Sequence, residues 1–129
     1  MNQRGFATLE VILMVMVIAI LASIAVPRFT AVTTAANTAK IQADLSTIDT
    51  AIAIYVMREG KEPSELKDLA DYLRGADGDL KPPSGKCYID GTEDNVPANQ
   101  YTISTVDEEK RAVCGSDNTA EKFSTQKKS

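Results

Sequence analysis

Histidine and tryptophan are both absent from this chain of 129 residues. Without histidine the chain has no imidazole to act as a general base or metal ligand near neutral pH, and it can form no Ser–His or Cys–His nucleophile pair. Its four tyrosines and three phenylalanines are few for a base-stacking surface. Its two cysteines cannot build a four-thiolate zinc site. The composition therefore points away from most enzymes, and we predict no catalytic residue, no metal site and no cofactor.

A strong excess of one charge is also lacking. There are 14 lysines and arginines against 18 aspartates and glutamates, which gives a net charge of −4. This balance does not predict an extended positive surface for a polyanion. Because acidic residues surround the basic ones along the sequence, we expect scattered surface charge rather than a basic patch. Nucleic acid is therefore not indicated as a partner.

Charged residues are almost missing from one long segment. Between Phe6 and Val26 the only ionisable side chain is that of Glu10. As a helix this segment would be about 31 Å long, which is enough to cross the hydrocarbon layer of a membrane. The sequence after Pro27 is polar and acidic, apart from spaced apolar positions. The chain is thus predicted to have two parts, an apolar helix and a water-soluble head.

Two plain interpretations of the apolar segment stay open. The first is a secretory signal peptide cleaved after Ala25, although the segment exceeds the usual core of about 7–15 residues and contains Glu10. The second is a single-pass anchor for an extracytoplasmic binding domain that does not polymerise. In such an anchor Arg4 would favour a cytoplasmic N-terminus, and the helix N-terminus would stabilise Glu10. As for the function of the protein, an exported enzyme is a further possibility, but the sequence shows no nucleophile–base pair, metal cluster or phosphate-binding loop to support it.

A third interpretation of the segment explains why Gly5, Phe6 and Glu10 occur together. Gly5 has no side chain, so a protease can approach the backbone closely at that point. Cleavage after Gly5 would place a new α-amino group on Phe6, one helical turn from Glu10 and on the same face. A cation and an anion at the tip of an apolar helix can pair within a subunit or between subunits, and in an apolar assembly the pairing between subunits fixes their register. The spacing therefore predicts a register mark for polymerisation.

The stretch from Arg4 to Glu10, the apolar run after it and Pro27 together resemble the class III signal of type IV pilins and type II secretion pseudopilins. The resemblance implies that a prepilin peptidase cuts between Gly5 and Phe6 and that Phe6 is then N-methylated. It also implies that Glu10 meets the N-terminus of a neighbouring subunit during assembly. Many members of the family read Phe-Thr-Leu-x-Glu, whereas here an alanine precedes the threonine; the spacing from Gly5 to Glu10 is kept.

The same resemblance implies a location and partners. The precursor would sit in the cytoplasmic (inner) membrane with its N-terminus inside, and the processed subunit would join a helical homo-oligomer, an extracellular or periplasmic filament. An assembly ATPase and a platform membrane protein would drive the transfer. We expect a leader at residues 1–5, a membrane-spanning and filament-core helix at 6–27, a globular head at 28–115 and a flexible tail at 116–129.

Apolar residues in the first part of the head recur with the period of a helix. They step by four, three, four and three positions, which defines one stripe: Ile41, Leu45, Ile48, Ile52 and Tyr55. We therefore expect one long helix from about residue 6 to 58, with a kink where Pro27 removes a backbone donor. Gly60 and then Pro63 end it.

The rest of the head is predicted to be mixed. A second helix is expected over residues 64–74, capped by Ser64. Residues 76–86 have the composition of a loop, residues 86–90 that of a short strand, and residues 101–106 and 111–114 that of a hairpin. The fold class is therefore α+β: a long N-terminal helix packed on a small head with a short helix and a small antiparallel β-sheet.

The two cysteines are too far apart in sequence for a Cys-x-x-Cys redox motif. Outside the cytoplasm a cysteine pair tends to oxidise, and closing the loop from Cys87 to Cys114 would stabilise the head by roughly 3–4 kcal/mol. We predict a structural disulfide between them, with two free buried thiols as the alternative.

Two acidic turns raise the question of calcium, which prefers hard oxygen ligands. Asp77 and Asp79 flank Gly78, and a second group of acidic residues surrounds Gly91. Neither group has the spacing of a complete calcium-binding loop. We therefore predict solvated turns at both places.

Overall fold

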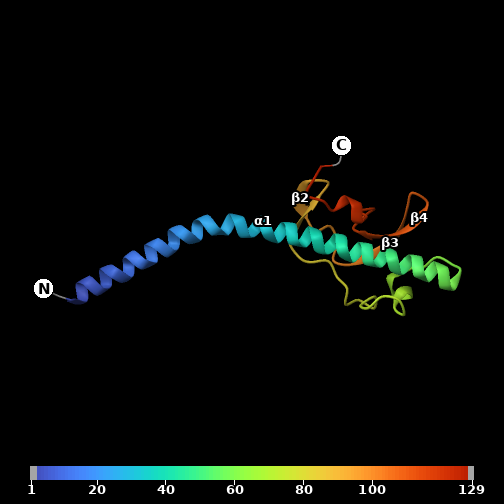
Figure 1. The fold of residues 1–129 in the computed structure, drawn as a ribbon, viewed down its shortest axis with the longest axis horizontal. Helices are drawn as coiled ribbons and strands as arrows, with labels where there is room; N and C mark the ends of the chain where they lie inside the picture. Colours follow the sequence, from blue (N-terminus) through green and yellow to red (C-terminus); the bar gives the residue numbers. More distant parts are fainter. Residues whose placement is uncertain (1–2, 128–129) are drawn as a thin grey trace. The chain divides into compact units, whose positions relative to one another are not determined.

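A computed structural model describes residues 3–127 of the chain, apart from the side chains of residues 25–28. The fold is α+β, as predicted. Its elements in chain order are α1 (Gln3–Glu59), the 3-10 helix η1 (Leu66–Leu69), β1 (Lys86–Ile89), β2 (Thr92–Asn95), β3 (Tyr101–Val106), β4 (Glu109–Cys114) and the 3-10 helix η2 (Ala120–Lys122) (Figure 1). The chain divides into two compact units, residues 1–32 and residues 33–129, and each is described by itself.

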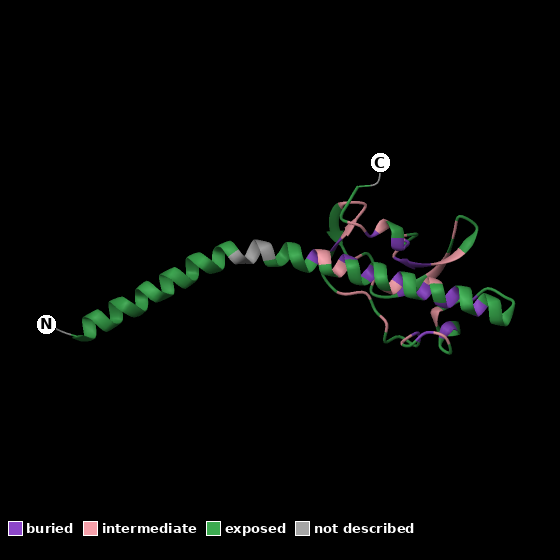
Figure 2. Cartoon of the chain, viewed as in Figure 1, coloured by how far each residue is buried: buried purple, intermediate pink, exposed green. Residues whose placement is uncertain are grey.

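The first unit contains the apolar part of α1. From Gly5 to Ile24 every side chain is exposed, which appears in Figure 2 as a continuous green ribbon. A helix that is apolar on all sides is typical of a segment that a membrane or an assembly covers. Helix α1 continues through Pro27, and the kink expected there stays a prediction.

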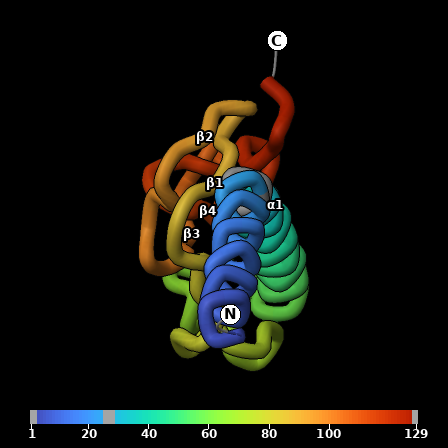
Figure 3. Tube along the Cα trace, turned by 90° about the vertical axis from the view of Figure 1, so that its left-hand side faces the viewer, coloured from blue at the N-terminus to red at the C-terminus, as the bar shows by residue number. Residues whose placement is uncertain are grey.

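The second unit builds its core on the remaining part of α1. The predicted stripe is confirmed: Ile41, Leu45 and Ile48 are completely buried, and Ile52 and Tyr55 nearly so (Figure 2). These side chains pack in one cluster with residues from η1, the turns after it, β1, β3, β4 and η2, namely Leu69, Leu73, Ala76, Cys87, Tyr101, Ala112, Cys114, Ala120 and Phe123. Figure 3 shows both hairpins on one side of this part of the helix. The head is therefore organised by one helical face.

Both sheets are two-stranded antiparallel hairpins, β1–β2 and β3–β4. The first turns at Asp90 and Gly91 and the second at Asp107 and Glu108, and all four residues have positive φ angles, between 49° and 78°. Such two-residue turns match the twist of the flanking strands. The second turn is tighter than the predicted four-residue connection, because Glu109 and the residue after it pair with β3.

β2 corrects one expectation. Residues 92–95 were predicted to be part of a solvated acidic turn, but they pair with β1 along its whole length. Their side chains are all exposed, so no alternation of apolar and polar residues indicates a strand there. The tight turn at Asp90 and Gly91 makes the pairing possible.

The helix predicted over residues 64–74 is also corrected. Only Leu66–Leu69 is helical, as a single 3-10 turn, and turns follow it. The cap is different too, because the Asp68 carboxylate accepts hydrogen bonds from the amides of Ser64 and Glu65 at 2.9 and 3.1 Å. A helix this short gains little from its own hydrogen bonds, so burial of Leu69 and Leu73 determines the path of the segment.

The segment after β4 folds back on the head instead of extending as the predicted flexible tail. Phe123 is completely buried. The backbone amides of Asp90 and Gly91 donate to the carbonyls of Lys122 and Ser124 at 2.7 and 3.0 Å. Phe123 is therefore enough to anchor the tail as far as Ser124.

Candidate functional site

Gly5 and Phe6, where processing is predicted, both lie within α1. A Cβ atom built on Gly5 would meet nothing within 4 Å. Glycine costs a helix about 1 kcal/mol relative to alanine, and neither packing nor backbone geometry requires it at this position. Phe6 is 58% exposed. Within the described residues, the fold thus gives no reason for a glycine here.

Three polar side chains occur in the apolar segment 6–24, and two of them are bonded within the helix. The Thr8 hydroxyl donates to the Arg4 carbonyl at 2.9 Å, and the Ser23 hydroxyl donates to the Ile20 carbonyl at 2.7 Å. Among the described residues, Glu10 has no hydrogen-bond or ion-pair partner. Glu10 is therefore the one polar side chain of this segment without a partner among the described residues.

Glu10 lies at one end of an apolar face. A shallow open groove along the helix is lined by Glu10 and by four apolar residues one and two turns further on, Leu13, Met14, Val17 and Ile18. These positions share one side of a helix. A second apolar helix laid against this face would bring its own polar group to the Glu10 carboxylate or leave that carboxylate unpaired.

The first part of α1 is long and apolar enough to cross a membrane, and none of that stretch is buried. A signal sequence near the N-terminus satisfies the same criterion.

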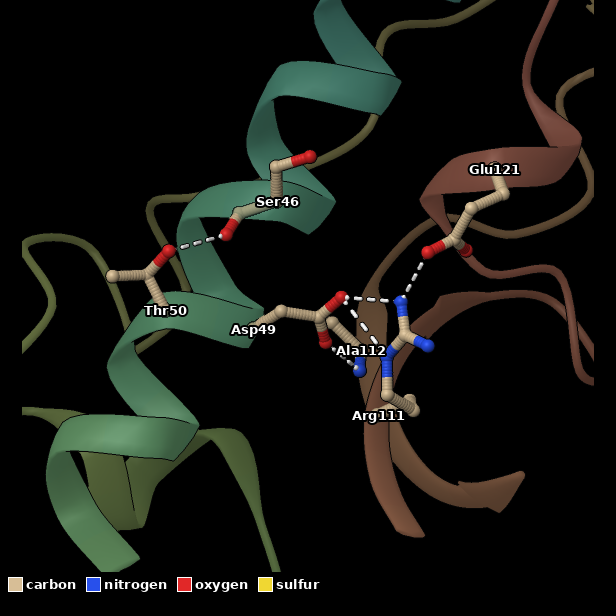
Figure 4. Close-up of polar contacts among 6 residues, drawn as sticks. All are labelled: Ser46, Asp49, Thr50, Arg111, Ala112 and Glu121. Atoms are coloured by element: carbon tan, nitrogen blue, oxygen red, sulfur yellow. Dashed lines mark hydrogen bonds and ion pairs between the residues drawn. The ribbon is translucent and has the colours of Figure 1, made fainter. Parts of the chain in front are cut away.

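In the head the strongest polar contact joins α1 to β4 (Figure 4). The Asp49 carboxylate accepts hydrogen bonds from the Arg111 guanidinium at 3.0 and 3.2 Å and from the Ala112 amide at 2.8 Å. Arg111 also pairs with Glu121 at 2.6 Å. The bond from Arg111 lowers the pKa of Glu121 to about 2, and its two acidic partners raise the pKa of Arg111. Charges paired in this way hold α1, β4 and the C-terminal segment together.

A second polar contact joins α1 to β3 and lies nearer the N-terminal end of α1 than Asp49. The Tyr101 hydroxyl donates to the Asp44 carboxylate at 2.7 Å, and Lys40 forms an ion pair with the same carboxylate. Burial, and then the bond to Asp44, raise the pKa of Tyr101. Asp44 and Asp49 lie outside the apolar stripe, and their partners on β3 and β4 are more than 50 residues away in the chain, so no local pattern in the sequence indicates these contacts.

The predicted disulfide is not present in the structure. Cys87 and Cys114 are both completely buried and both free. They belong to the same core cluster. Burial raises the pKa of Cys114 to about 11 and also raises the pKa of Cys87. The structure therefore has the alternative arrangement, which is two buried free thiols.

The acidic turns do not gather into a metal site in the described part of the chain. No group of three or more histidine, cysteine, aspartate or glutamate side chains there is arranged to hold a metal ion. Asp77 and Asp79 lie in a turn around Gly78, and the acidic residues after Gly91 belong to β2.

Comparisons with known proteins give no further assignment: no family model, no curated protein and no solved structure matches this chain. The long apolar helix joined to a small α+β head is compatible with a pilin-like architecture. The residues from Arg4 to Glu10 carry the more specific likeness.

Proposed function

We propose that this chain is a non-enzymatic structural subunit, a pilin or pseudopilin, that polymerises into a type IV filament. A prepilin peptidase cuts between Gly5 and Phe6, Phe6 is N-methylated, and the helix starting at Phe6 enters the filament core. The precursor resides in the cytoplasmic membrane, and the filament is extracellular or periplasmic.

One observation carries the proposal. Glu10 is the single polar side chain in the described apolar segment 6–24 that has no partner within its own chain. An unpaired carboxylate among exposed apolar side chains is costly in a membrane or in an apolar assembly. A new α-amino group on the Phe6 of a neighbouring subunit would neutralise it. A subunit that is shifted along the filament axis leaves both charges unpaired. This pairing therefore also sets the register of the filament.

Gly5 gives independent support. A glycine that lowers helix stability, and for which packing and backbone geometry give no reason, is explained if another protein must approach the backbone there. A peptidase that grips the chain next to the scissile bond needs such an approach.

The partners of the proposal follow from the energetics of extraction. Lipid tails are nearly as apolar as the helix, so burying apolar helices against one another cannot by itself drive a subunit out of the membrane. An assembly ATPase acting through a platform membrane protein would supply that work. A helical filament also needs two different complementary faces on each subunit, because its contacts do not close into a ring.

The test is the intact mass of the protein extracted from the membranes of cells that contain a prepilin peptidase. The expected mass corresponds to a chain that begins at Phe6 and carries one additional methyl group. Cells without the peptidase are the control, and there the chain should keep Gly5. A chain that keeps Gly5 in both cells, or one cleaved after Ala25, would overturn the proposal.

A further inference from the structure

The two hairpins leave four outer strand edges, of which two are bonded to other segments and a third carries charge. In β1, the Tyr88 amide donates to the Thr38 hydroxyl at 2.7 Å, and the Lys86 carbonyl accepts from the Asn37 side chain at 2.9 Å. The outer edge of β1 is therefore covered by polar side chains of α1.

The outer edge of β4 is covered as well, and that of β2 carries the charges of Glu93 and Asp94. The Asn95 amide of β2 donates to the neighbouring Asp94 carboxylate at 2.7 Å. In β4, the Ala112 amide donates to Asp49 at 2.8 Å and the Cys114 amide donates to the Asn118 carbonyl at 3.0 Å. Edges with occupied donors, and edges that carry charge, resist pairing with another chain.

The register of the second hairpin shows which groups of β3 point outward. Val106 and Glu109 flank the two-residue turn and form a hydrogen-bonded pair. Pairing then alternates along the strand, so the backbone groups of Ile103 and Thr105 point away from β4. The opposite residue Ala112 confirms the alternation, because its amide also points away from the hairpin, towards Asp49.

The outer edge of β3 has no such cover. Among residues 3–127, no backbone hydrogen bond joins Ile103 or Thr105 to a segment other than its own hairpin. The strand reads YTISTV, with no charge and no proline. It therefore lacks the features that usually protect an edge strand, and its β-branched residues favour an extended partner.

This edge borders a groove. The groove has a volume of about 560 Å³ and runs between the start of β3 and two segments, around η1 and around Gly78. Its apolar lining includes the half-buried side chains of Leu66, Leu80 and Ile103. Its charged lining residues are Glu65, Lys67 and Asp77, all exposed. The groove thus borders main-chain groups of β3 that have no partner among residues 3–127 and offers apolar contacts. Its lining has one more acidic than basic side chain.

We propose that the outer edge of β3 binds an extended segment of a partner protein as an added antiparallel or parallel strand. Main-chain hydrogen bonds from Ile103 and Thr105 provide affinity, as in other cases of strand addition. The groove selects apolar side chains at alternate positions, and the excess of acid at the groove favours a basic residue beside them. This binding activity is separate from the proposed filament function and does not depend on processing at Gly5.

The test uses the full chain in detergent micelles, with a capped peptide that reads Lys-Val-Thr-Val-Thr-Val-Lys. Amide signals of Ile103 and Thr105 are followed by NMR during titration. Two matched peptides are methylated on their backbone nitrogens, one at every valine and the other at every threonine. Only one set of these nitrogens can face β3, so we expect one methylated peptide to lose affinity by about tenfold or more and the other to keep it within a few-fold.

A protein variant tests the same edge from the other side. Thr105→Pro removes an outward amide but no bond to β4, and proline is accepted on edge strands. It should weaken peptide binding about tenfold, whereas the control Thr105→Val, which keeps the amide, should not. Thermal unfolding shows whether both variants remain folded. If Thr105→Pro does not fold, the two methylated peptides test the β3 edge without it.

Three results would overturn the proposal. One is the absence of any shift at Ile103 and Thr105 with millimolar peptide. Another is equal binding of both methylated peptides. The third is protection of these two amides that rises with protein concentration without peptide, because this would assign the edge to a second copy of the chain rather than to a separate partner.

Discussion

The carboxylate of Asp49 on α1 accepts hydrogen bonds from both the side chain of Arg111 and the backbone amide of Ala112 on β4. One aspartate thus joins the long helix to a strand that lies 60 residues further along the chain. Because Arg111 reaches Glu121 as well, the same contact also holds the C-terminal segment.

Asp49→Ala should therefore destabilise the head. The substitution leaves the Ala112 amide without its acceptor and removes one of the two partners of Arg111. A lost bond of this kind, partly exposed to solvent, costs about 1–3 kcal/mol. Urea unfolding of the full chain in detergent measures the change. Asp79→Asn, at an exposed turn residue, is the control and should shift the free energy of unfolding by less than about 0.5 kcal/mol. Equal effects of the two variants would contradict the role assigned to Asp49.

The Arg111–Glu121 pair predicts a loss of stability in acid. The pKa of Glu121 is about 2 in the folded head against an ordinary value of 4.5, so the folded state favours the ionised form. Its contribution is present above pH 4.5 and is lost as the pH falls through 4.5 towards 2. Unfolding measured across this range should show a decline that is smaller in Glu121→Gln, which cannot ionise. A decline of equal size in both proteins would show that other carboxyl groups cause it.

The parts of the fold that the sequence predicted are those whose signal is local. The stripe from Ile41 to Tyr55 is a regular repeat, and a helix buries such a repeat on one face wherever the partner surface lies. The β3–β4 hairpin likewise has its two strands and its turn within 14 residues. These elements could be located without knowledge of their surroundings.

The missed features depend on distant partners. β2 has no apolar alternation, and only the Asp-Gly pair at its start, a strong hairpin signal, could have indicated it. Phe123 is buried because other elements form a pocket for it. The contacts of Asp49 and the groove beside β3 also arise only when segments far apart in the sequence come together, which periodicity does not reveal. Gly5 and Glu10, on which the proposed assembly depends, were predicted from their spacing alone, and their roles stay predictions.

The buried thiols predict a loss of stability at alkaline pH. The pKa of Cys114 is raised to about 11 against an ordinary value of 9.0, so the folded state favours the neutral thiol. Its stabilising contribution is complete below pH 9 and is lost as the pH rises through 11. In the reduced protein, unfolding free energy should fall over this range, and Cys114→Ala should flatten the decline. Thiol counting in the denatured protein checks the redox state, and fewer than two thiols without reductant would show that the chain had oxidised.

Glu10→Ala should abolish or disorder filament assembly while membrane insertion is unchanged. The variant removes the one unpaired polar group of the described apolar segment but makes that segment more apolar, so it still partitions into the membrane. The control is Thr8→Ala, because the Thr8 hydroxyl is already bonded to the Arg4 carbonyl and assembly should be retained. Filaments sheared from cells and membrane fractions are compared by immunoblot. Normal filaments from Glu10→Ala would show that other contacts hold the assembly. The absence of filaments from the unaltered chain as well would favour the alternative of an anchored domain that does not polymerise.

Gly5→Ala should block processing without harming the protein. A Cβ at this position meets nothing within 4 Å, and alanine is the better helix former by about 1 kcal/mol, so the helix and the head should be at least as stable as before. A peptidase that approaches the backbone beside the scissile bond would encounter the added methyl group. The expected result is a full-length chain in the membrane, with an unchanged unfolding midpoint and no filaments. Asn2→Ala, at a leader residue remote from the cleavage point, is the control and should be cleaved normally. Efficient cleavage of Gly5→Ala would mean that this glycine is not the recognition point, and the proposal would then depend on Glu10 alone.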